Sequence, residues 1–148
     1  MESERALDKL FTLPDSESQV RLRGAIDLVE RDEDGTARVW DFKTQGTAHS
    51  KADTASNQQL ATYQLALALE QDDGQPVDGA GFVYLRLDAG KNNPQPATRQ
   101  QESVDIDTQL AHTADLVRIV GEEEFPAHPG AQCARCDFRD SCPAQGGQ

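Results

Sequence analysis

Basic residues are scarce in this sequence of 148 residues. Lysine and arginine number 14 against 26 aspartates and glutamates, so the formal net charge is −12. Proteins contact nucleic-acid phosphates mainly through lysine and arginine. This balance excludes a free-standing protein that binds nucleic acid over a broad basic surface. A nucleic-acid role would need a small local site, metal ions or a basic partner.

Long apolar runs are also missing. No segment approaches the roughly 18 consecutive apolar residues that a membrane helix needs, and the N-terminal stretch MESERALDKLF lacks the basic start and apolar core of a secretory signal. We therefore expect a cytoplasmic protein with no membrane partner. No internal repeat is visible, and the length fits a single domain, 1–148, with a core of its own.

Cysteine is confined to the C-terminal tail, residues 125–148. Cys133, Cys136 and Cys142 follow a C-x2-C-x5-C spacing. An odd number of closely spaced cysteines in a chain expected to be cytosolic favours metal ligation over disulfides. Three thiolates are one short of the four ligands that zinc or an iron–sulfur cluster usually takes. His128 could complete a zinc site, a fourth ligand could lie outside this chain, or the three cysteines could be free and buried.

The apolar pattern predicts a hairpin of two strands near the start of the chain. Every second residue from Val20 to Leu28 shares one face, and the residues between them, with Val29, share the other. Asp34-Gly35 is a strong turn signal, and 37–43 forms the partner strand. The remaining pattern predicts a short strand within residues 1–18, a polar loop over 44–57, a helix over 58–71, a central strand over 80–87, a loop over 88–101, an edge strand over 102–106 and a helix over 108–121 with Asp107 as its N-cap. This order indicates an α/β or α+β fold with a mixed central sheet flanked by helices.

Two carboxylates and a lysine are expected to meet on this hairpin. A turn centred on residues 33–35 places Asp27 opposite Asp41, and Lys43 shares a face with Asp41 because side chains alternate along a strand. Two hard oxygen donors suit Mg²⁺, and a neighbouring lysine can position a water or stabilise charge that develops on phosphorus. A surface charge network is the commoner explanation of such a trio when the spacing stands alone.

Gln59 and Tyr63 form a second candidate pair. They are four residues apart on the predicted helix and therefore share one helical face. A half-buried tyrosine beside a solvated glutamine would explain them equally well. Next to a metal site, the glutamine could orient the lysine or a phosphate.

Four short motifs follow one another along the chain: GAID at 24–27, DFKTQG at 41–46, QLATY at 59–63 and CARCDFRDSC at 133–142. In order and spacing, over about residues 8–142, they resemble the RecB-type nuclease domain of the PD-(D/E)XK superfamily. The similarity is to the C-terminal nuclease module of AdnB- and AddB-like helicase–nucleases. Leu28 stands where that family often has arginine, and Gln45 interrupts its Lys-Thr-Gly run.

The resemblance implies a restriction-endonuclease-like core and the hydrolysis of DNA phosphodiesters with Mg²⁺ or Mn²⁺. It implies an exonuclease that works in DNA end processing and recombinational repair. By the same resemblance, the metal would be held by Asp27, Asp41 and the backbone carbonyl of Phe42, with Asp8 in DKLF as a further candidate, while Lys43 would be the catalytic lysine and Gln59 and Tyr63 its auxiliary pair.

The family's cysteines hold a 4Fe–4S cluster, so the resemblance assigns Cys133, Cys136 and Cys142 to such a cluster. The fourth cysteine of the family lies far upstream and is missing from this chain. We therefore expect an N-terminally truncated part of a larger helicase–nuclease, with DNA and a helicase region as partners and weak or no activity alone. The alternative is a non-catalytic docking module stapled by an iron–sulfur or zinc site, the latter with His128.

Overall fold

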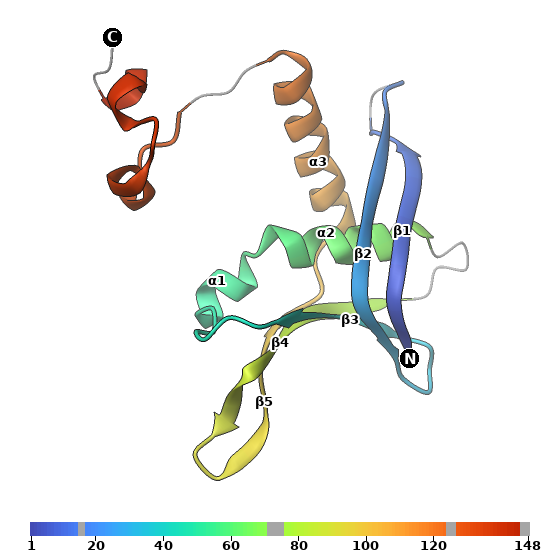
Figure 1. The fold of residues 1–148 in the computed structure, drawn as a ribbon. Coiled ribbons are helices and arrows are strands. Elements are labelled where there is room, and N and C mark those ends of the chain that lie inside the picture. Colours follow the sequence, from blue (N-terminus) through green and yellow to red (C-terminus); the bar gives the residue numbers. More distant parts are fainter. Residues whose placement is uncertain (15–16, 71–75, 124–126, 146–148) are drawn as a thin grey trace. The chain divides into compact units, whose positions relative to one another are not determined.

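The computed structural model describes residues 1–14, 17–70, 76–123 and 127–145. The chain comprises two compact units, Met1–Ala114 and Asp115–Gln148. The first unit contains a five-stranded sheet, and the elements can be followed in Figure 1. They are β1 (Glu2–Thr12), β2 (Gln19–Arg31), β3 (Ala37–Lys43), α1 (Lys51–Ala55), α2 (Gln58–Glu70), β4 (Val77–Gly90), β5 (Asn93–Gln101) and α3 (Ile106–Gly121).

The strands lie side by side in chain order, from β1 to β5. β3 and β4 run parallel, whereas the other neighbouring pairs are antiparallel. A parallel pair needs a long crossover, and the segment with α1 and α2 supplies it. The sheet is therefore mixed and carries helices, as the sequence predicted for a restriction-endonuclease-like α/β fold.

The register of the β2–β3 hairpin is the predicted one. Leu28 pairs with Trp40 and Val29 with Val39, so the same register continued by one residue sets position 27 against position 41. Gly35 forms the turn at a φ of 85°. Glycine adopts that conformation without the steric penalty that a Cβ would bring.

β2 is irregular beside the hairpin. Ile26 and Val29 are both fully buried although they are three residues apart, which regular alternation along a strand does not allow. The paired part of β2 and β3 ends at Leu28. In the register with β1, Glu4 falls opposite Asp27 and has a φ of 50°. Asp27 therefore stands where β2 and β3 part.

The core lies between α2 and the sheet. α2 packs against β1, β3 and β4, so an alanine- and leucine-rich face covers the middle strands (Figure 1). Leu60 and Leu67 are fully buried and Tyr63 is partly buried, as the predicted stripe requires. The predicted last residue of this helix, Gln71, lies outside the described residues.

Two predictions about the second half of the sheet were wrong. Residues 88–101 were predicted as a loop, but they complete β4 and form β5. Pro94 and Pro96 are compatible with β5 because it is an edge strand, where a missing N–H donor costs little. The predicted edge strand 102–106 is not a strand; the chain there leaves β5 and enters α3.

Two helix starts also differ from the sequence-based expectation. The predicted polar loop 44–57 contains the short helix α1, whose N-cap Ser50 accepts a hydrogen bond from the Asp53 N–H. α3 is capped by Asp105 rather than Asp107. The Asp105 carboxylate accepts from the Thr108 N–H at 2.8 Å and from its hydroxyl at 2.6 Å, which is the geometry of an N-cap.

The second unit contains the cysteine-bearing tail. Its described residues form three short 3₁₀ helices, at Ala131–Arg135, Arg139–Ser141 and Pro143–Gln145. Within the predicted tail, 125–126 and 146–148 lie outside the described residues. None of the described helices is both long and apolar enough to cross a membrane.

Candidate functional site

Side-chain alternation at the end of β3 brings an acid and a lysine together on one face of the sheet. Asp41 and Lys43 lie on the face that α2 covers, and Asp41 is 5% exposed. The Lys43 ammonium lies 2.7 Å from Asp41 Oδ2 and 5.0 Å from the centre of the Phe82 ring. The ion pair and the aromatic face both stabilise the cation in this position.

Asp27 reaches the same place from β2. Its Oδ2 accepts a hydrogen bond of 2.7 Å from the backbone N–H of Phe42. The N–H and C=O of one strand residue face the same neighbouring strand, so the Phe42 carbonyl is directed toward β2 as well. Asp27 and the Phe42 carbonyl therefore lie at the opening between β2 and β3, beside Asp41.

Gln59 joins the acid and the lysine. Its amide nitrogen donates to Asp41 Oδ1 and to the Tyr63 hydroxyl, both at 3.0 Å, and its carbonyl oxygen accepts from Lys43 Nζ at 3.1 Å. The opposite amide orientation would set an NH₂ group against the ammonium. The predicted pair, Gln59 and Tyr63, is thus part of one hydrogen-bonded network with Asp41 and Lys43.

The two oxygens of Asp41 have different partners. Oδ1 accepts from Gln59, whereas Oδ2 is buried and lies 2.7 Å from the Lys43 ammonium, its ion-pair partner. Oδ2 has no hydrogen bond beyond this ion pair within the described part of the chain, so a metal held by Asp41 would share the carboxylate with Lys43. No cluster of three or more His, Cys, Asp or Glu side chains among the described residues could hold a metal. Two carboxylates and a carbonyl suit Mg²⁺, which keeps several waters.

Asp8 does not join this site. It lies on β1 opposite Arg23, about 13 Å along β2 from Asp27 by strand geometry. Its carboxylate instead accepts hydrogen bonds of 2.6 and 2.7 Å from Arg21, which lower the pKa of Asp8. Arg23 adds a weaker ion pair at 3.7 Å.

No sequence pattern pointed to His49, which packs against Phe82, the ring that the Lys43 ammonium also contacts. The His49 ring is partly buried and stacks on Phe82 with a centroid distance of 4.9 Å. Its Nδ1 lies 2.7 Å from the hydroxyl of the fully buried Tyr84. A lone histidine in a polar loop has no periodicity that could have revealed this contact.

The three cysteines of the tail line one pocket of about 200 Å³, together with His128. The Gly130 N–H donates to Cys133 Sγ at 3.3 Å. All three are free cysteines. The donor set suits zinc or an iron–sulfur cluster, but within the described residues these side chains are not arranged as a formed metal site.

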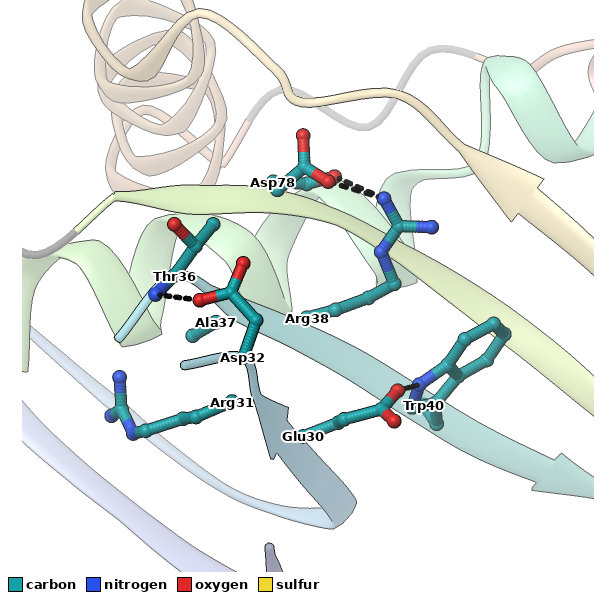
Figure 2. A pocket seen from close by; sticks show the side chains of 8 residues that line it. All are labelled: Glu30, Arg31, Asp32, Thr36, Ala37, Arg38, Trp40 and Asp78. Atoms are coloured by element: carbon teal, nitrogen blue, oxygen red, sulfur yellow. Dashed lines mark hydrogen bonds and ion pairs between the residues drawn. The ribbon is translucent and has the colours of Figure 1, made fainter. Parts of the chain in front are cut away.

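Figure 2 shows a second pocket, of about 250 Å³, at the turn end of the β2–β3 hairpin. It is lined on β3 by Arg38 and Trp40, which alternate with the residues of the candidate site. Arg38 is paired with Asp78, and the Trp40 indole N–H donates to Glu30 at 2.9 Å. The charges of Arg38 and Asp78 are paired and Glu30 is occupied by the indole, so these groups are not directed at the chemistry considered above.

Comparison with known proteins decides the family. A scan against protein families matches residues 1–143 to the PD-(D/E)XK nuclease superfamily. The chain belongs to this superfamily. Asp41-Phe42-Lys43 reads as the acidic-x-Lys part of the superfamily's name.

A solved structure described as "Crystal structure of SSO0001" resembles this PD-(D/E)XK chain with a TM-score of 0.54 and 18% sequence identity. The alignment covers 97% of this chain and 61% of that chain, so this chain spans about three fifths of its length. At this identity the likeness concerns the fold. A search of the curated proteins finds no match.

Proposed function

We propose that this PD-(D/E)XK chain hydrolyses DNA phosphodiesters with Mg²⁺ or Mn²⁺ at the opening between β2 and β3. The observation that carries the proposal is the buried Asp41 carboxylate, which is paired with Lys43 through one oxygen and accepts a hydrogen bond from Gln59 through the other. A surface charge network would not bury its acid or order it with a glutamine. Asp41 is 5% exposed, which favours a built site.

The contacts support a role for each residue of the site. Asp27, Asp41 and the Phe42 carbonyl would hold the metal, which would supply a Lewis acid and lower the pKa of a coordinated water. Lys43 is positioned beside Asp41 to stabilise negative charge that develops on the phosphate. Gln59 fixes the direction of the lysine and of Asp41.

The test is cleavage of linear DNA with and without Mg²⁺. We expect metal-dependent cleavage, weak in this chain alone and raised by the helicase region, that Asp41→Ala and Asp27→Ala abolish. Asp88→Ala is the matched control, because Asp88 is an exposed aspartate at the far end of β4. Cleavage that survives both site substitutions would overturn the assignment of the site.

We further propose that the enzyme acts as an exonuclease within a cytoplasmic helicase–nuclease that processes DNA ends. Support comes from the net charge of −12, since a basic channel for DNA must then be supplied by a partner. The expected substrate pattern is cleavage of linear DNA and none of closed circular DNA, with a large stimulation by the helicase region. Equal cleavage of circles would contradict the exonuclease mode.

A metal site in the cysteine pocket is a separate proposal. Three thiols and His128 on one pocket support either a 4Fe–4S cluster with an external fourth thiolate or a zinc ion with His128. Iron with sulfide after anaerobic purification would support the cluster. Stoichiometric zinc that is lost in His128→Ala would support zinc, and with it the alternative of a non-catalytic docking module if the β2–β3 site binds no metal.

A further inference from the structure

His49 is anchored from two sides at the end of the loop that follows Lys43. Its ring stacks on Phe82 at an interplanar angle of 23°, and the Lys43 ammonium lies over the same Phe82 ring. The Tyr84 hydroxyl contacts both the His49 backbone N–H, at 3.0 Å, and the ring Nδ1, at 2.7 Å. Tyr84 pairs with Lys43 in the sheet, so the histidine and the lysine share one neighbourhood.

These contacts fix which ring nitrogen of His49 carries the proton. The Tyr84 hydroxyl accepts the backbone N–H of His49, and its own proton then needs an acceptor. Tyr84 is fully buried, and within the described part of the chain His49 Nδ1 is the one acceptor within hydrogen-bond distance of the hydroxyl. Nδ1 therefore accepts, so the neutral imidazole carries its hydrogen on Nε2.

The Nε2–H group points away from Tyr84, because the two nitrogens lie on opposite sides of the ring. The His49 side chain is partly exposed, and Nε2 has no hydrogen-bond partner among the described residues. A rigid, oriented donor that is left free, on a ring that shares Phe82 with Lys43, is suited to an anionic oxygen. In a chain with so few basic residues, such a donor matters for holding a phosphate.

We propose that His49 Nε2–H binds a phosphate oxygen of the DNA. This phosphate is next to the one whose negative charge Lys43 stabilises, and Tyr84 holds the His49 ring in the required tautomer. This inference rests on the proposed nuclease function. The competing explanation is that His49 only ties residues 44–50 to β4 through Tyr84.

The tautomer can be measured on the full chain without DNA. The sequence has three histidines, so long-range ¹⁵N–¹H correlation spectra at mildly alkaline pH are simple to assign with His49→Asn. We expect the Nε2–H form for His49 in the wild-type chain and a mixture of tautomers in Tyr84→Phe. A wild-type His49 that carries its proton on Nδ1 would overturn the inference.

Two substitutions separate phosphate binding from anchoring. His49→Gln places an amide N–H as many bonds from Cα as Nε2, whereas His49→Asn places a carbonyl oxygen at the distance of Nδ1. Binding of a labelled DNA oligonucleotide is measured by fluorescence anisotropy in EDTA, so that no cleavage occurs. We expect Kd to rise about tenfold in His49→Asn and by less than about twofold in His49→Gln. The reverse order, or no change in either variant, would favour anchoring and overturn the proposal.

The outcomes for His49 and for the nuclease can be told apart. Binding with the expected order, but no metal-dependent cleavage, would leave the His49 contact standing and sink the nuclease function. The opposite result is cleavage that Asp41→Ala abolishes, with a DNA affinity in both His49 variants equal to that of the wild-type chain. It would leave the nuclease function standing and overturn the His49 contact. A wild-type chain that neither binds DNA nor, with the helicase region present, cleaves it would overturn both.

Discussion

The Asp27 carboxylate closes the gap between β2 and β3 by accepting a 2.7 Å hydrogen bond from the Phe42 backbone N–H. The β2–β3 ladder has ended one residue earlier, at Leu28 and Trp40. The Asp27 side chain thus accepts the hydrogen bond of a β3 N–H where the backbone pairing with β2 has ended. The same carboxylate is left with a second oxygen that can serve as a ligand.

This relationship makes Asp27→Asn a specific test. The amide oxygen of asparagine can still accept from Phe42, so we expect the free energy of unfolding in urea to change by less than about 0.5 kcal/mol. The loss of the negative charge should weaken Mn²⁺ binding at least about tenfold, measured by calorimetry. Wild-type Mn²⁺ affinity in Asp27→Asn would remove Asp27 from the metal site.

Gln59→Ala should lower the rate of DNA cleavage by about 10- to 100-fold. The amide orders both Asp41 and Lys43, so its loss leaves the carboxylate and the ammonium free to change rotamer. Gln58→Ala is the matched control, since Gln58 is the exposed neighbour on the same helix. The comparison is a single-turnover cleavage rate at saturating Mg²⁺, and equal rates in the two variants would refute a role for the network.

Gln64→Leu should destabilise the fold by about 3 kcal/mol. Gln64 is fully buried, donates to Gln101 Oε1 at 2.9 Å and accepts from the Val104 N–H at 3.0 Å. Leucine would leave the buried Gln101 Oε1 and the partly buried Val104 N–H without these hydrogen bonds. Gln58→Leu makes the same chemical change at an exposed position and should be nearly neutral in urea unfolding. Similar losses in the two variants would contradict the network.

The N-cap of α3 should make its helicity sensitive to acid. Hydrogen bonds from the Thr108 hydroxyl and N–H lower the pKa of Asp105 below its ordinary value of 3.8. The folded state therefore prefers the carboxylate, so its stabilisation is complete above that ordinary value and is lost as the pH falls through the lowered pKa. Circular dichroism should show reduced helix content for Asp105→Ala at neutral pH and a smaller change for Asp107→Ala. A larger loss of helix content in Asp107→Ala than in Asp105→Ala would show that Asp107 is the N-cap.

Much of the hairpin and the helix could be predicted from the sequence because the signals are local. The Asp34-Gly35 turn fixes the register, and the register fixes the meeting of Asp27 with Asp41. The four-residue spacing of Gln59 and Tyr63 fixes their common face. The irregular stretch between Ile26 and Val29 could not be predicted, because it arises from the parting of two strands rather than from residue type.

The second half of the sheet was missed for a different reason. β5 carries polar residues and two prolines because it is an edge strand with one face in solvent, and such a strand reads like a loop. The anchoring of His49 depends on Tyr84, which is 35 residues away. Contacts of this kind follow from the parallel pairing of β3 with β4, and no local sequence pattern predicts them.

The most direct test of the nuclease assignment is the Mg²⁺-dependent cleavage rate of linear DNA in Lys43→Ala against Lys51→Ala. Lys43 pairs with Asp41 at the site, whereas Lys51 is an exposed lysine at the start of α1. We expect Lys43→Ala to lose cleavage by at least about 100-fold and Lys51→Ala to keep the wild-type rate. Wild-type cleavage by Lys43→Ala would contradict the assignment of the β2–β3 opening as the active site.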